Sequence, residues 1–273
     1  MAENQIIIEP HSRLSLRFRE LWQYRELFYF FTWRDIKVKY KQTYLGIIWA
    51  LIQPLSLMLL FTFVFSKNLN FSSSPLRYEI FVLSGLILWN LFYSSVSMAS
   101  ESMLQHAAII KKVFFPRLII PVSSILAALF DFIIALIAFL IFSIVYKVFP
   151  GWTAFYSFPF AILLILVSAF GTGVFLSALN IKYRDFRYVV PFVLQFLFFA
   201  TQVVYPLNKI EPDWLRYSMA LNPVNGAVEL FRYAYTGQFE SAIVIISAAS
   251  ALFITFIGLL YFRKSEAYFA DLS

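Results

Sequence analysis

Long apolar stretches alternate with short polar ones along almost the whole chain. A helix needs about 20 mostly apolar residues to cross a hydrocarbon core of about 30 Å. Six stretches reach or approach that length, and we predict each to be a membrane-spanning helix. They are 45–65, 78–100, 118–146, 158–179, 189–205 and 240–262. The third is long enough to tilt or to project beyond the bilayer, and the fifth is near the lower limit. The pattern therefore predicts an all-α integral membrane protein with six spans.

The composition supports this class. Of the 273 residues, 61% are hydrophobic and 14% are charged, against about 45–50% and about 25% in an ordinary soluble domain. The absence of cysteine excludes disulfides and thiolate chemistry. Two histidines are too few for a histidine cluster. We expect no metal site, no cofactor and no nucleic-acid partner for this chain.

Positive charge is unequally divided between the two sides of the predicted bundle. Sixteen Lys and Arg residues fall on the side of the termini, and six fall on the other side. Because cytoplasmic loops carry the excess of Lys and Arg, we expect both termini in the cytoplasm. The expected organisation is a cytoplasmic region 1–44, a membrane domain 45–262 and a cytoplasmic tail 263–273.

An amphipathic helix is expected before the first span, within 20–41. Its apolar positions recur at helical spacing, with polar and basic residues on the neighbouring stripe. The apolar stripe consists of Trp22, Tyr29, Trp33, Ile36 and Tyr40. Aromatic side chains at headgroup level and cations toward anionic lipid are typical of a helix in the cytoplasmic interface. Such a helix can serve as a membrane anchor or can also bind a partner.

Two short helices are predicted between the fifth and sixth spans, in 206–237. Pro212 and Pro223 suit a first helical turn, Asn222 suits the N-cap and Gly237 suits a C-terminal stop. We expect both helices to dip into the outer leaflet without crossing it, as at a pore mouth. The residues that we expect at this opening are Asn222, Pro223, Val228, Phe231 and Tyr235.

Ionisable residues inside the predicted spans are scarce. Asp131 is the clearest, and no other predicted span offers it an obvious basic partner. A lone carboxylate can belong to a proton relay, but we expect its side chain to face the interior and to bond Ser or Asn. Neither a carboxylate cluster nor a glycine-rich phosphate loop is present. The chain therefore cannot hydrolyse ATP by itself.

Aromatic and amide side chains in or near the spans are a candidate carbohydrate path. Flat rings stack on the C–H faces of sugars, and amides bond the hydroxyl groups; for any one ring, packing or lipid contact remains the alternative. The candidates are Trp49, Gln53, Trp89, Phe92, Tyr93, Phe199 and Tyr205.

The turn between the second and third predicted spans is both basic and apolar. Adjacent lysines, adjacent phenylalanines and a Pro-Arg pair occur within "HAAIIKKVFFPRLIIP", residues 106–121. Snorkelling cations at a membrane surface explain the charges but leave the phenylalanines unexplained. The two adjacent phenylalanines therefore need a further explanation.

Five stretches together resemble the membrane subunits of ABC exporters for bacterial polysaccharides, most closely the O-antigen group, with capsule and teichoic acid exporters as relatives. They are "YKQTYLGIIWALIQPL" (40–55), "IIKKVFFPRLIIPV" (109–122), "LNIKYRDFRYVVPF" (179–192), "YPLNKIEPDWLRYSMALNPVNGAVELFRYAYTG" (205–237) and "YFRKSEAYFADLS" (261–273). The resemblance covers nearly the whole chain in order. It implies export of an undecaprenyl-linked polysaccharide across the bacterial inner membrane. It also implies that the exporter consists of two copies of this chain and two ATP-binding subunits, and that ATP and Mg are bound by those partner subunits.

The resemblance also implies roles for individual segments. The ATPase would contact the turn at Gln105, Ile109, Ile110, Lys111, Lys112, Phe114, Phe115, Pro116 and Arg117. The 20–41 helix would share that contact, 40–45 would gate the cytoplasmic mouth, and the 206–237 helices would form the outer gate. Tyr183, Arg184 and Asp185 would fix the second cytoplasmic turn structurally. A permease of the same architecture for teichoic acid, lipid or drugs remains an alternative, as does a membrane-bound lipid-linked glycosyltransferase.

Overall fold

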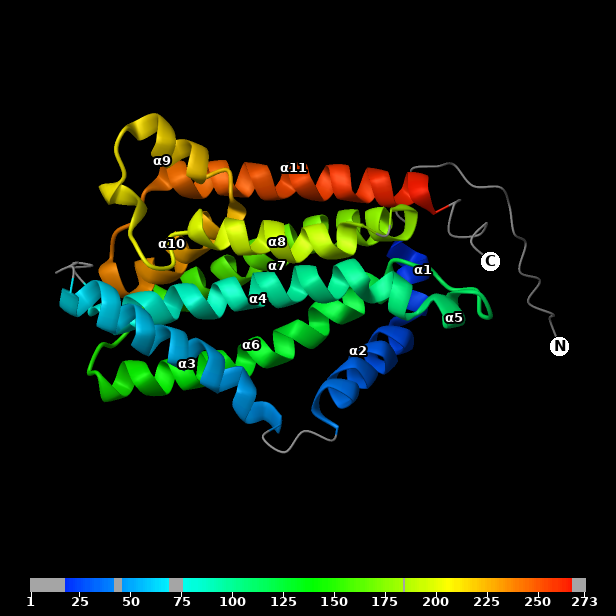
Figure 1. Ribbon diagram of the computed structural model, residues 1–273, viewed down its shortest axis with the longest axis horizontal. Coiled ribbons are helices and arrows are strands. Elements are labelled where there is room, and N and C mark those ends of the chain that lie inside the picture. Colours follow the sequence, from blue (N-terminus) through cyan, green and yellow to red (C-terminus); the bar gives the residue numbers. More distant parts are fainter. Residues whose placement is uncertain (1–17, 42–45, 69–75, 184, 267–273) are drawn as a thin grey trace.

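The computed structural model describes residues 18–41, 46–68, 76–183 and 185–266 of the chain. These residues form helices joined by short connections, with no strand among them (Figure 1). The elements are α1 Phe18–Gln23, α2 Arg25–Tyr40, η1 Gly46–Ile48, α3 Trp49–Phe61, η2 Thr62–Asn68, α4 Tyr78–Gln105, α5 Ala107–Ile110, α6 Ile119–Val145, α7 Ala154–Lys182, α8 Phe186–Phe199, η3 Leu207–Lys209, α9 Asp213–Met219, α10 Pro223–Thr236 and α11 Ser241–Ser265. The prediction of an all-α membrane protein is confirmed.

Four helices, α4, α6, α7 and α11, are long and apolar enough to cross a membrane. They correspond to the second, third, fourth and sixth predicted spans. The first and fifth correspond to shorter apolar helices, Trp49–Phe65 and Phe186–Phe199. A crossing by these two shorter helices, and with it the total of six spans, stays a prediction.

The core of the bundle is built around α4, whose side chains are almost continuously buried from Tyr78 to Phe92. Helices α6 and α7 pack against it, and α11 packs on the far side of α7. The crossing of α7 and α11 is very close, because a Cβ on Gly258 would lie 2.3 Å from the Gly171 carbonyl oxygen. Backbones approach this closely in membrane bundles only where both helices present small residues.

The fifth apolar helix ends earlier than its hydropathy predicts. We expected a span over 189–205, but α8 ends at Phe199 and the next residues form turns. The Asn225 amide nitrogen donates to the Ala200 carbonyl, and the Gln202 backbone N–H donates to Asn225 Oδ1 at 2.7 Å. These side-chain bonds replace the helical hydrogen bonds that the backbone gives up.

The two short helices before the last long one are confirmed as α9 and α10. The Asn222 carboxamide accepts the Val224 N–H at 3.2 Å, Pro223 is the first residue of α10, and Gly237 ends it at φ 67°. Both helices lie at the end of the molecule opposite α1, α5 and the C-terminal end of α11 (Figure 1).

The predicted single helix over 20–41 is wrong in one respect, because it is interrupted at Tyr24, between α1 and α2. The stripe of apolar residues therefore does not run unbroken from Trp22 to Tyr40. Tyr29 and Trp33 do share a face of α2, with ring planes 8° apart and centroids 6.5 Å apart. Both rings are exposed.

Candidate functional site

The 106–117 loop joins α4 to α6 and contains the short helix α5. Its two adjacent phenylalanines have opposite surroundings: Phe114 is 81% exposed, whereas Phe115 is 6% exposed. Lys111 and Lys112 are exposed beside Phe114. The loop therefore presents one ring and two cations outward, and uses the other ring to fix itself to the protein.

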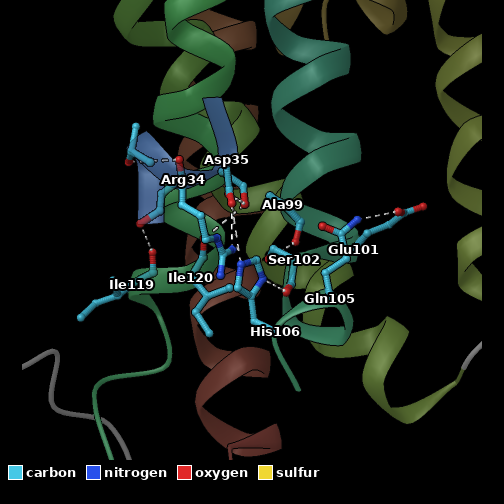
Figure 2. A network of polar contacts seen from close by, with 12 residues as sticks. Arg34, Asp35, Ala99, Glu101, Ser102, Gln105, His106, Ile119 and Ile120 are labelled. Atoms are coloured by element: carbon cyan, nitrogen blue, oxygen red, sulfur yellow. Dashed lines mark hydrogen bonds and ion pairs between the residues drawn. The ribbon is translucent and has the colours of Figure 1, made fainter. Parts of the chain in front are cut away.

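Helix α2 packs against this loop with a face that the sequence pattern did not reveal. Phe31 is buried, and its ring lies 5.7 Å from Phe115 and 5.6 Å edge-on from His106. Figure 2 shows Asp35 and Arg34 of α2 directed toward His106, which ends α4. Sequence reasoning missed Phe31, Asp35 and His106. Leu27, Phe31 and Asp35 recur at the four-residue spacing of one helix face, and that repeat was the available signal.

Beyond the loop, α2 continues along the first half of α6 in the same direction. The Thr32 hydroxyl donates to the Ser123 carbonyl, and the Ser124 hydroxyl donates to Asp35, both at 3.3 Å. At the end of α2, Lys39 and the Tyr40 hydroxyl contact the two carboxylate oxygens of Asp131. Asp131 was expected to be hydrogen-bonded, for instance to Ser or Asn; it is hydrogen-bonded, but its partners are Lys39 and Tyr40. Its partners come from α2, which lies outside the predicted spans and so was not considered.

The Tyr40 phenol remains a donor to this carboxylate. Burial, together with the hydrogen bond to Asp131, raises the pKa of Tyr40, so the hydroxyl keeps its proton at neutral pH. The contact therefore joins one cationic and one neutral donor to a single carboxylate.

A cavity of about 220 Å³ lies beside this contact, between α2, α3, α4 and α6. It brings together three residues of the candidate carbohydrate path, Trp49, Gln53 and Tyr93. Asp131, Lys39 and Asn90 supply further polar groups to its wall. The cavity thus combines aromatic faces with hydrogen-bonding groups, which is the chemistry that sugar rings need.

The remaining candidates for that path are dispersed. Trp89 and Phe92 are buried in the core, with Trp89 edge-on to Phe198 at 5.6 Å. Phe199 is exposed at the end of α8, and its carbonyl accepts the Tyr205 hydroxyl. Buried rings cannot touch a polymer in this arrangement, so Trp89 and Phe92 do not line a path for one.

The residues expected at the outer opening pack inward from α10. Val228 and Phe231 are fully buried, and Phe231 stacks on Phe158 of α7 at 4.2 Å. The Tyr235 ring lies 5.9 Å from Phe139 of α6. In this arrangement α10 is firmly seated on α6 and α7.

Arg232 of α10 is a buried cation that the sequence reasoning did not single out. Its guanidinium donates to the Phe81 carbonyl at 2.9 Å and to the Val203 carbonyl at 3.3 Å. It also donates to the Ser84 hydroxyl at 3.2 Å and lies over the Phe81 ring at 3.4 Å. Arg232 therefore joins α10 to α4 and to the turn after α8.

The second cytoplasmic turn, between α7 and α8, is described only in part. Tyr183 and Asp185 are exposed, and the Tyr183 ring lies 6.3 Å from Phe186. Arg184 lies outside the described residues. The structural role expected for this turn stays a prediction.

Four long apolar helices that could cross a membrane are characteristic of a multi-pass membrane protein. The comparisons with known proteins show that this one is a transporter subunit. The family model described as "ABC-2 type transporter" matches residues 26–236, and the chain belongs to this family. It is the transmembrane subunit of an ABC exporter, a class that works with an ATP-binding partner.

Named relatives align over most of their own length. An O-antigen export system permease, RfbA of Myxococcus xanthus, is 32% identical over 76% of this chain and 78% of its own. RfbA of Klebsiella pneumoniae is 26% identical over 88% of this chain and 92% of its own. The polysialic acid transport protein KpsM of Escherichia coli is 24% identical over 85% of this chain and 91% of its own.

Proposed function

We propose that this chain exports a lipid-linked polysaccharide of the O-antigen kind across the bacterial inner membrane. The observation that supports this most strongly is the similarity to polysaccharide export permeases along 76–88% of the chain. The lipid carrier in this proposal is undecaprenyl, and both termini face the cytoplasm. Two copies of the chain and two ATP-binding subunits make up the working exporter.

In this proposal the ATP-binding subunit contacts the 106–117 loop. Phe114 enters an apolar groove, while Lys111 and Lys112 pair with acidic groups at its rim. Phe115 stays in its own protein and transmits the movement of the loop to α2 and α6. Gln105, Ile109, Ile110, Pro116 and Arg117 shape the loop around these anchors.

The glycan is proposed to enter beside the cavity at Trp49, Gln53 and Tyr93. The Lys39–Tyr40–Asp131 contact holds the end of α2 at this mouth. On the opposite side α10 is the outer gate, closed in the present arrangement by Val228 and Phe231. Membrane lipids cover the exposed rings of Trp22, Tyr29 and Trp33.

Deleting the gene in its host and locating the finished lipid-linked glycan tests this function. Loss of surface glycan, with the glycan accumulating on the cytoplasmic face of the inner membrane, is the expected result. Export must return when the chain and its ATP-binding subunit are supplied together, and must fail when that subunit cannot hydrolyse ATP. A host that still exports every surface glycan without this chain would overturn the proposal.

A further inference from the structure

His106 stands where the end of α4, the 106–117 loop and α2 meet. It is 4% exposed. The Phe31 ring covers it edge-on, and Phe31 in turn contacts Phe115. The imidazole is thus enclosed between the two elements that are proposed to contact the ATP-binding subunit (Figure 2).

The hydrogen bond on one side of the ring fixes its tautomer. Nδ1 lies 2.6 Å from the Ser102 carbonyl oxygen, and a carbonyl can only accept. Nδ1 therefore carries the proton of the neutral ring, and Nε2 carries the lone pair. Nε2 is buried and has no hydrogen-bond partner among the described residues. The carboxylate oxygen nearest to it, Asp35 Oδ1, is 3.8 Å away.

The charged groups facing the ring come from α2. Asp35 Oδ1 accepts from Arg34 at 2.8 Å, and the Arg34 guanidinium lies 5.1 Å from the centre of the Phe31 ring. From α6, the uncharged Ser124 hydroxyl bonds Asp35 Oδ2.

The loop's own Lys111 and Lys112 are exposed to solvent. Two further charged groups near the joint have partners away from the ring. Glu101 of α4 accepts from Gln105 and lies 4.0 Å from Arg187. Arg117, just before α6, donates to the Glu266 carbonyl. The carboxylate that lies nearest to Nε2 is that of Asp35, and it already accepts hydrogen bonds from Arg34 and Ser124.

We propose that neutral His106 is a positioning residue that holds the 106–117 loop against α2, and that protonation of Nε2 loosens this joint. The inference rests on the proposed coupling role of the two elements. Its physical basis is that an enclosed ring fits as a neutral group, whereas an imidazolium needs solvent or a free carboxylate. Asp35 offers only partial compensation, because it already serves Arg34 and Ser124.

The direction of titration agrees with this geometry. Burial lowers the pKa of His106, and the Ser102 carbonyl only partly opposes the effect. The pKa of His106 in the closed joint therefore lies below the value of about 6.5 of a free histidine, and the neutral ring stabilises the closed joint fully at pH values above about 6.5. The stabilisation is lost as the pH falls below that value, because the opened joint binds the proton more tightly.

The first test follows the distance between α2 and the loop in the assembled exporter. The chain has no cysteine, so spin labels can be placed at Lys37→Cys and Val113→Cys, both exposed and neither assigned to the contact with the ATP-binding subunit. Between pH 7.5 and pH 5.5 the distance distribution should broaden in the otherwise unaltered chain. His106→Gln should remove this change, and His11→Gln, which alters the other histidine, should preserve it. Equal broadening in His106→Gln would overturn the inference.

The second test follows coupling and covers the case in which His106→Gln does not assemble. Glycan exported per ATP hydrolysed should fall by about twofold or more between these pH values. Across this range the imidazole of the opened joint, whose pKa is ordinary, changes from mostly neutral to mostly charged, and its protonation favours opening. Asp35→Asn should make the fall steeper, since it removes the partial compensation. Imidazole nitrogen NMR of the two histidines should find the His106 proton on Nδ1 at pH 7.5. The opposite tautomer, or an Asp35→Asn chain with an unchanged profile, would contradict the inference. Absence of ATP-driven export at pH 7.5 would instead count against the proposed function.

Discussion

The Tyr40 hydroxyl, on the last residue of α2, donates to the carboxylate of Asp131 in the middle of α6. Lys39 contacts the other carboxylate oxygen. Positions about 90 apart in sequence are thereby fixed together beside the cavity that holds Trp49 and Gln53. The mid-helix acid that sequence alone left without a partner anchors the end of α2.

Breaking this anchor should open the mouth of the cavity. In a chain carrying Gln53→Cys, we expect Asp131→Asn or Lys39→Met to raise the rate of maleimide labelling in membranes. Residues in direct contact are coupled by about 0.5–3 kcal/mol, so the effects of substituting both do not add. The labelling rate of the double variant Asp131→Asn/Lys39→Met should therefore be close to that of either single variant. A cysteine at Tyr188, which is exposed elsewhere, should label at an unchanged rate. Additive effects of the two substitutions would show that the contact does not hold the mouth.

The adjacent phenylalanines of the 106–117 loop should separate docking from stability. Phe114→Ala should weaken co-purification with the ATP-binding subunit by about 1.5–3 kcal/mol, the contribution of burying one such ring, and should leave thermal unfolding unchanged. Phe115→Ala should cost about 3–5 kcal/mol of stability, as removal of a buried ring usually does. Thermal unfolding in detergent and quantitative pull-down measure the two effects. The reverse assignment, with Phe114→Ala destabilising and Phe115→Ala neutral, would be inconsistent with the structure.

Arg232 should be required to seat α10. Replacing it with Met removes the guanidinium's hydrogen bonds to the Phe81 and Val203 carbonyls, and a hydrogen bond from a charged group contributes about 1.5–3 kcal/mol. We expect a lower unfolding temperature and, if α10 is the proposed outer gate, leakage of small solutes across the membrane. Arg232→Lys should recover only part of the loss, because an ammonium lacks the planar fork of donors. As a control, Arg187→Met at an exposed site should stay within about 0.5 kcal/mol of the unaltered chain.

The close crossing of α7 and α11 should not tolerate a side chain. A Cβ at position 258 would meet the Gly171 carbonyl oxygen at 2.3 Å, so Gly258→Val must separate the helices. Overpacking of this kind costs about 1–3 kcal/mol, measurable as a lower unfolding temperature. Gly151→Ala is the matched control, since its nearest neighbour, the Ala234 carbonyl, lies at an ordinary 3.4 Å. A Gly258→Val chain as stable as this control would argue against the crossing.

The class of the protein and most of its helices could be predicted from the pattern of apolar residues alone. An apolar run that is long enough to span a bilayer can form little else than a helix. Lipid offers no hydrogen-bond partners, so the backbone N–H and C=O groups must bond to one another within the segment. Local signals were sufficient at the ends of α10, where Asn222, Pro223 and Gly237 act through their own backbone neighbours.

Tertiary structure decided which side chains meet. Phe114 and Phe115 are chemically identical, and only the packing of distant residues such as Phe31 and Phe262 around one of them makes Phe115 an internal anchor and leaves Phe114 exposed. The early end of α8 depends on Asn225, and the partners of Asp131 come from α2. The hydropathy pattern shows which face of a helix is apolar, but not which segment packs against that face. The neighbour is decided only when segments that are distant in sequence pack together.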